Sequence, residues 1–161
     1  MMIRDAVDDD WTQIYPIFAA VVEAGETYAF PEGLSADEAR PWWMDQSSGR
    51  TVVAAEGDLV LGSAKMGPNR PGRGAHIGTA SFMIDVRQRG RGIGRALAVH
   101  MIEWSRQQGF AGIQFNAVVE TNLAAVALWT SLGFAIVGTV PGAFDHASQG
   151  RVGLHVMYLE L

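Results

Sequence analysis

The sequence predicts a mixed α/β (α+β) fold, in which antiparallel hairpins are followed by a β–α–β–α–β run. Three observations support this prediction: apolar residues change between strand and helix periodicity, glycines stand at the ends of the expected elements, and 48% of the residues are hydrophobic. Strands are expected at residues 2–7, 51–56, 59–66, 75–86, 113–119, 134–140 and 152–161. Helices are expected at residues 10–25, 35–43, 92–108 and 122–132.

The first half of the chain is predicted from caps and a hairpin. Asp10 stands at capping-box spacing before apolar residues that recur with the helical period, and Gly25 is expected to end that helix. Ser35 and Glu38 form a second capping box, which opens a short helix. Gly57 separates two apolar strands and therefore predicts a hairpin.

The second half of the chain alternates strands and helices. A long strand that contains Gly78 leads through a glycine-rich turn into a helix, on which Leu97 and Met101 share one face. Gly109 ends that helix, and Gly133 ends the following one. Two closing strands complete the expected sheet.

Composition narrows the class of protein. The 161 residues fit a single domain over 1–161, and the formal net charge of −5 argues against a nucleic acid partner. The chain contains no cysteine, which excludes disulfides, a thiolate zinc site and a cysteine nucleophile, and we expect no metal. The first ten residues, MMIRDAVDDD, lack the apolar run of a signal peptide, and no segment approaches the roughly 20 apolar residues of a bilayer span. We therefore expect a cytoplasmic protein without membrane contact.

Positive charge is concentrated in the glycine-rich turn. Four of the eleven arginines lie within residues 87–95, together with Gly90, Gly92 and Gly94. A turn from strand to helix presents unpaired N–H groups and the positive end of the helix dipole, and glycine lets a ligand approach the backbone closely. The pattern predicts a binding site for a phosphate or diphosphate.

Other phosphate-binding motifs fit this turn less well. A P-loop requires Gly-Lys-Ser/Thr, whereas this chain has Gly94-Arg95-Ala96, and a dinucleotide fingerprint requires a third glycine where Leu97 stands. A basic connection without a ligand is the remaining alternative.

Two motifs resemble a known family. Arg89, Gly92 and Gly94 form R-x-x-G-x-G, which resembles the pyrophosphate-binding motif of the GNAT superfamily of acyl-CoA-dependent N-acetyltransferases. Residues 122–134, NLAAVALWTSLGF, resemble that family's C-terminal helix and turn. The resemblance implies a mixed, mostly antiparallel sheet that is splayed between two central strands and flanked by helices.

A narrower resemblance connects the chain to the phosphinothricin and methionine sulfoximine acetyltransferase branch. It rests on residues 25–45, 70–74 and 150–161. Enzymes of this branch acetylate the α-amine of small glutamate-like amino acids.

The family resemblance implies that acetyl-CoA is the co-substrate. Its pantetheine arm would lie between the splayed strands, where a backbone N–H would also stabilise the oxyanion. Asn122 matches a position that contacts pantetheine, and it is equally suited to cap a helix. The residues expected to bind the cofactor are Ile84, Asp85, Val86, Arg89, Gly90, Arg91, Gly92, Ile93, Gly94, Arg95 and Asn122.

The catalytic base departs from the branch pattern. Thr79 stands where the branch has a glutamate, and a threonine cannot act as a general base at neutral pH. Glu23, Glu26 and His76 are the alternatives, of which Glu26 and His76 are the predicted catalytic residues.

The proton donor for the leaving thiolate departs as well. Trp129 occupies the position of the relatives' tyrosine or histidine, and an indole N–H is no usable acid. Water, the attacking amine, Tyr28 and His146 remain as alternative sources of that proton.

Four residues are expected to contact the acceptor: Tyr28, Phe30, Arg73 and Thr79. The aromatic residues would line an apolar pocket and the arginine would bind a carboxylate, although core, dimer or surface roles explain the same residues. The sequence thus predicts acetyl transfer to a small-molecule primary amine by direct attack in a ternary complex, in a homodimer. The alternatives are a non-catalytic acyl-CoA sensor and an acetyltransferase for protein N-termini or polyamines.

Overall fold

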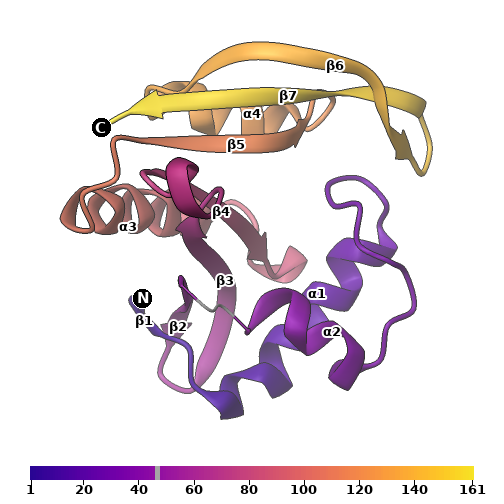
Figure 1. Ribbon diagram of the computed structural model, residues 1–161. Helices are drawn as coiled ribbons and strands as arrows, with labels where there is room; N and C mark the ends of the chain where they lie inside the picture. The colour runs from indigo at the N-terminus through magenta and orange to yellow at the C-terminus, as the bar shows by residue number, and fades with distance from the viewer. Residues whose placement is uncertain (46–47) are drawn as a thin grey trace.

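The computed structural model describes residues 1–45 and 48–161, through which one seven-stranded sheet runs (Figure 1). Its strands are β1 (Met2–Asp5), β2 (Arg50–Glu56), β3 (Leu59–Pro68), β4 (Ile77–Ile84), β5 (Gly112–Val119), β6 (Ala135–His146) and β7 (Gly150–Glu160). The helices are α1 (Trp11–Glu23), α2 (Ala36–Trp43), α3 (Ile93–Gln107) and α4 (Leu123–Ser131), with short 3₁₀ turns η1 (Asp8–Asp10), η2 (Gly72–Gly74) and η3 (Val86–Gln88). The predicted mixed fold is confirmed.

The sheet splits between its two parallel strands. The strand order is β1-β2-β3-β4-β5-β7-β6, and every neighbouring pair is antiparallel except β4 and β5. These two strands pair only through Ile77 with Gly112 and Gly78 with Ile113. Beyond this contact β4 and β5 diverge (Figure 1), which confirms the splay that the family resemblance implied.

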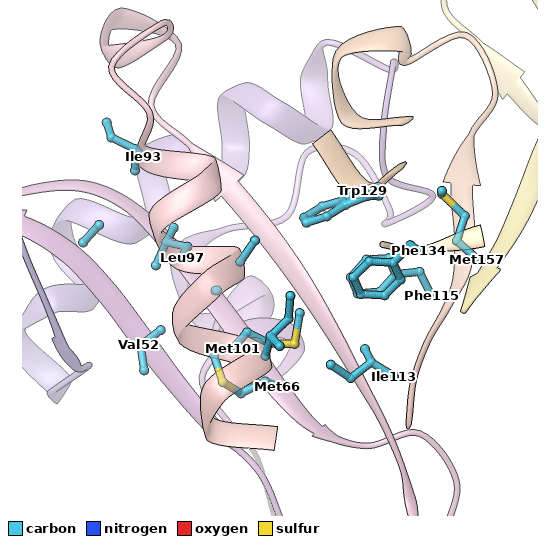
Figure 2. Packing of buried hydrophobic residues seen from close by; sticks show 14 of the residues in the cluster. Val52, Met66, Ile93, Leu97, Met101, Ile113, Phe115, Trp129, Phe134 and Met157 are labelled. Carbon is cyan, nitrogen blue, oxygen red and sulfur yellow. The ribbon is translucent and has the colours of Figure 1, made fainter. Parts of the chain in front are cut away.

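Hydrophobic cores fill both faces of the sheet. On one face α3 and α4 pack on the strands: Met101 of α3 lies close to Met66, and Phe115 and Phe134 lie close to Met157 (Figure 2). On the other face α1 and α2 bury Phe18 and Trp43. Because both faces are covered, the middle of β2 is buried at every residue rather than at alternate ones.

The predicted capping box at Asp10 is wrong. Helix α1 begins at Trp11, and the Asp10 side chain makes no cap hydrogen bond to it. Instead, the Asp10 carboxylate accepts hydrogen bonds from Arg4 Nη1 at 2.6 Å, Arg4 Nη2 at 2.8 Å and the Val7 N–H at 2.8 Å. The hydrogen bonds from Arg4 hold the pKa of Asp10 below its usual range. Because Arg4 belongs to β1 and Asp10 directly precedes α1, the ionised carboxylate connects these two elements.

The final hairpin is longer than expected. The two closing strands were expected at residues 134–140 and 152–161, yet β6 continues to His146 and β7 starts at Gly150. A shift of register between Val140 and Phe144 forms a bulge, with Gly142 at φ +61°. The hairpin therefore reaches His146 and Gly150 on either side of its tip.

None of the described helices has the length and apolar character to cross a membrane.

Asp10→Asn tests the junction between β1 and α1. Because the folded-state pKa of Asp10 is lowered, its contribution to stability is present above the unfolded pKa near 3.9 and is lost as the pH falls below it. We expect Asp10→Asn to lower the free energy of unfolding by about 1–3 kcal/mol at pH 7, and the difference from wild type to be smaller at pH 3, because it is lost progressively as the pH falls from the unfolded pKa toward the lower folded-state pKa. Urea unfolding at both pH values measures this. The exposed Asp9→Asn is the control, and an equal loss in both variants would contradict the assignment.

Candidate active site

A groove of about 1320 Å³ lies where β4 and β5 separate. One half is lined by the end of β4, the glycine-rich turn and the first residues of α3 and α4. The other half is lined by α1, the segment 26–29 that follows it and the tip of the β6–β7 hairpin. One continuous groove therefore connects the predicted diphosphate site to the predicted acceptor region.

An ion pair between the buried Asp85 and the exposed Arg87 shapes the turn after β4. The Asp85 carboxylate accepts the Arg87 N–H at 2.9 Å and Arg87 Nη2 at 2.7 Å. These hydrogen bonds lower the pKa of Asp85, whose side chain is nearly inaccessible to solvent. The Arg87 guanidinium is thus paired with a carboxylate of its own turn. Asp85 lines the groove, but its carboxylate already accepts hydrogen bonds from Arg87.

The glycines of the turn have two different tasks. Gly90 and Gly92 adopt positive φ values of +79° and +75°, which other residues rarely take. Gly92 is the N-cap of α3, so the N–H groups of Ile93, Gly94 and Arg95 have no acceptor within the helix. A Cβ on Gly94 would meet only Leu128 Cδ2, at 3.7 Å, so the fold itself has room for a side chain there. The bare backbone at Gly94 instead leaves space in the groove.

The structure separates Arg91 from the other three arginines of the turn, because Arg87, Arg89 and Arg95 all line the groove. Arg91 donates to Glu56 at 2.8 Å and to Gln88 at 2.6 Å, and it does not line the groove. Arg89 and Arg95 do line it, and Arg95 Nη2 also donates to Ser131 Oγ at 2.7 Å. The predicted contact between Arg91 and the cofactor is therefore not supported by its position, because the Glu56 carboxylate of β2 holds the Arg91 guanidinium outside the groove.

The remaining predicted cofactor residues all reach the groove: Ile84, Asp85, Val86, Arg89, Gly90, Gly92, Ile93, Gly94, Arg95 and Asn122. Asn122 Oδ1 also accepts the Ala125 N–H at 3.2 Å, so the residue caps α4 and faces the groove at once. Thr121 beside it was not predicted; its buried Oγ1 has no partner among the described residues.

The separation of β5 leaves one backbone edge of β4 uncovered. Asp85 donates its N–H to Leu61 in β3, so by alternation Phe82 and Ile84 direct their N–H and C=O groups toward the gap. The Tyr28 hydroxyl accepts the Phe82 N–H and donates to the Phe82 carbonyl, each at 2.8 Å. Burial raises the pKa of Tyr28 to about 12, so this phenol stays protonated at neutral pH.

The predicted acceptor and catalytic residues divide by position. Glu26, Tyr28 and Thr79 line the groove. Phe30 does not, because its ring stacks on Tyr28 at 5.3 Å and on Phe18 at 5.4 Å as part of the core beneath.

Arg73 and His76 are also outside the groove. Both are exposed in the connection between β3 and β4, next to Ile77, where β4 is still paired with β5. The gap opens only toward the other end of β4, so the predicted catalytic role of His76 and the predicted acceptor contact of Arg73 find no support in their positions.

Two aromatic residues have roles that the topology decides. The buried Trp129 ring packs on Phe115 (Figure 2), with centroids 4.7 Å apart, and on Phe82, with centroids 4.9 Å apart; it lines the groove, but an indole N–H is no usable acid. His146 lines the acceptor half of the groove. Sequence analysis named His146 only as one of several proton donors, because it lies between the two strands that were expected at residues 134–140 and 152–161.

The family is established by comparison with known proteins. Residues 5–134 match the model of the acetyltransferase (GNAT) family. A GCN5-related N-acetyltransferase from Kribbella flavida is 56% identical, with a TM-score of 0.95 over 99% of this chain and 97% of its own. An L-methionine sulfoximine/L-methionine sulfone acetyltransferase from Pseudomonas paraeruginosa is 35% identical over 146 residues, covering 86% of this chain and 83% of that protein.

The chain therefore belongs to the GNAT family of acetyltransferases, and both resemblances seen in its motifs are confirmed. A GNAT phosphinothricin acetyltransferase from Sinorhizobium meliloti, solved in complex with AcCoA, shares the fold with a TM-score of 0.89 at 22% identity, over 99% of this chain and 88% of its own.

Arg89→Ala and Arg91→Ala test the division of the arginines. A charge-assisted hydrogen bond contributes about 1.5–3 kcal/mol, so loss of Arg89 should weaken CoA binding by roughly 10- to 100-fold. Arg91→Ala carries the same change in charge but should alter the affinity by less than about twofold, because its guanidinium is held by Glu56. Titration calorimetry with CoA measures both. Equal losses would mean that the net charge of the turn, not the direction of each side chain, determines the affinity.

Proposed function

We propose that this protein transfers the acetyl group of acetyl-CoA to the primary amine of a small molecule, in the cytoplasm. Acetyl-CoA is the co-substrate. The observation that carries the proposal is the single groove at the β4–β5 gap, which joins an anion-binding helix N-terminus to a region lined by Glu26 and His146. A donor bound at one end and an acceptor bound at the other would meet beside the open edge of β4.

The cofactor would be held mainly by the main chain. The N–H groups of Ile93, Gly94 and Arg95 suit the diphosphate, and the Arg89 guanidinium adds a positive charge beside it. The pantetheine arm would follow the uncovered edge of β4 as an added strand, with Asn122 opposite.

The chemistry needs a neutral amine and a polarised carbonyl. The ammonium first loses a proton, for which the Glu26 carboxylate, acting through water, is the proposed acceptor. The nitrogen then attacks the thioester carbon; the new C–N bond forms, the C–S bond breaks and its electron pair goes to sulfur. The second proton on nitrogen goes to the thiolate, so the products are an amide and CoA.

The backbone of β4 would stabilise the charge on the carbonyl oxygen. The N–H groups of Phe82 and Ile84 face the gap, and that of Phe82 is shared with Tyr28. Tyr28 is unsuited as the base because its pKa of about 12 keeps it protonated. Thr79 lines the groove without an ionisable group, so it suits acceptor binding rather than proton transfer.

We propose amino acid analogues such as phosphinothricin and methionine sulfoximine as acceptors. The support is the 35% identity to an L-methionine sulfoximine/L-methionine sulfone acetyltransferase across most of both chains. The competing functions are acetylation of protein N-termini, acetylation of polyamines and a non-catalytic sensor role. They differ in which amine, if any, leads to release of the CoA thiol from acetyl-CoA.

Thiol release from acetyl-CoA tests the proposal. We expect turnover with L-methionine sulfoximine or L-phosphinothricin, weaker turnover with spermidine and with a peptide bearing a free N-terminal alanine, and none without an amine. Each product is checked by mass spectrometry for one added acetyl group. Tight CoA binding without thiol release for any amine would instead establish an acyl-CoA sensor.

We also propose a homodimer, formed along the edge strand β6. Ile136 is 46% exposed, Val137 68% and Val140 54%, and an uncovered apolar edge strand is prone to pair with another strand. A second copy would pair through the same strand and bury these side chains.

Val137→Lys tests the dimer. The introduced charge should halve the mass measured by size-exclusion chromatography with light scattering, because an unpaired ammonium would be buried at the interface. The control is Val99→Lys, at an exposed valine of α3 that is outside β6. A wild-type mass equal to one chain would contradict the proposal.

A further inference from the structure

His146 stands at the acceptor end of the groove, at the last position of β6. Its side chain is only 7% exposed, and its ring lies edge-on to Phe144 with the centroids 6.3 Å apart. Both rings line the groove, together with Gln149 from the hairpin tip and Glu26 from the segment after α1.

The backbone determines which imidazole nitrogen carries the proton. The Ser148 N–H donates to His146 Nδ1 at 3.2 Å, so Nδ1 is the acceptor and the proton of the neutral ring is on Nε2. His146 Nε2 has no hydrogen-bond partner in the described part of the chain, yet it is not among the polar atoms sealed from solvent, as His100 Nε2 is. The ring therefore presents an N–H donor to the groove.

The position of this donor is fixed by contact with α1. The Ala147 N–H donates to the Gly25 carbonyl at 3.0 Å, which docks the hairpin tip on the end of that helix. Gly25 has a φ of +63°, and a Cβ there would come within 2.8 Å of Ala147 Cβ. The contact joins the neighbour of His146 to the neighbour of Glu26, so a hydrogen-bond donor and a carboxylate enter the groove at the same mouth.

We propose that His146 determines acceptor specificity by donating a hydrogen bond from Nε2 to an oxygen atom of the acceptor. This inference rests on the proposed function and narrows its substrate class. Glu26 attracts the ammonium, and His146 requires a second group that accepts a hydrogen bond, such as a carboxylate, phosphinate or sulfonyl oxygen. A polyamine has no such oxygen and would bury the N–H unpaired, which is costly.

The same geometry gives His146 a donor role rather than that of the base. In the tautomer set by the Ser148 N–H, the nitrogen that faces the groove carries a proton and has no free lone pair. His146 acts on the acceptor by hydrogen bonding, while Glu26 handles the proton.

The kinetic test compares His146→Phe with wild type on three amines: L-methionine sulfone, L-methionine without the sulfonyl oxygens, and 3-(methylsulfonyl)propylamine without the carboxylate. With wild type, one of the two truncated amines should have a kcat/KM about 10-fold lower than that of L-methionine sulfone. This amine is the one that lacks the oxygen to which His146 donates. His146→Phe keeps an aromatic ring against Phe144 and should abolish that difference, while the KM for acetyl-CoA stays within about twofold. His146→Gln, which restores an N–H donor near the position of Nε2, should recover part of the difference. If His146→Phe discriminates among the three amines as wild type does, the inference is wrong.

A spectroscopic test is independent of turnover. In protein labelled with ¹⁵N-histidine and saturated with CoA, the resonances assigned by their loss in His146→Phe should report a protonated Nε2 and an unprotonated Nδ1. L-methionine sulfone should shift the Nε2 resonance. Ser148→Ala, which keeps the backbone N–H, should leave the tautomer unchanged. A protonated Nδ1, or an Nε2 signal that ignores the amine, would overturn the role of His146. Absence of thiol release would overturn only the proposed function.

Discussion

The early end of pairing between β4 and β5 is the constraint on which the site depends. Two residue pairs hold the strands together, and beyond them no strand of the described residues covers the edge of β4 that faces β5. Buried N–H and C=O groups must find partners, so an uncovered central edge remains stable only where a ligand, water or a side chain meets it. The Tyr28 hydroxyl meets this need at Phe82, and the rest of the edge is free for a cofactor arm. Cofactor binding and acceptor approach thus share one interruption of the sheet.

Ion pairs decide which charges of the turn remain free for a ligand. Glu56 holds Arg91 away from the groove, and Asp85 pairs with Arg87 at its edge, so Arg89 and Arg95 are the groove-lining arginines without a carboxylate partner among the described residues. A cluster of arginines in the sequence therefore overstates the positive charge directed at the diphosphate. The two bound arginines stabilise the shape of the turn, and the free main-chain N–H groups complete the binding surface.

The acceptor half of the groove is assembled from segments far apart in the chain. Docking of the β6–β7 tip on Gly25 brings His146 beside a mouth that also carries Glu26. This arrangement places a carboxyl group and a hydrogen-bond donor in the groove without the strand glutamate and helix tyrosine that Thr79 and Trp129 replace. An acceptor with an ammonium and a nearby oxygen matches both groups, which agrees with the amino acid analogues named for the 35% identical relative.

The order of elements, the glycine-rich turn between β4 and α3 and the family followed from the sequence alone, because periodicity, glycines and capping residues act within a few positions of one another. Asp10 was misread for the opposite reason: its carboxylate prefers Arg4 across the strand–helix junction to the local cap. The tertiary structure alone decided the length of the β6–β7 hairpin, the removal of Phe30, Arg73 and His76 from the groove, and the entry of His146. Those outcomes depend on strand register and on contacts between distant segments, which no local pattern encodes.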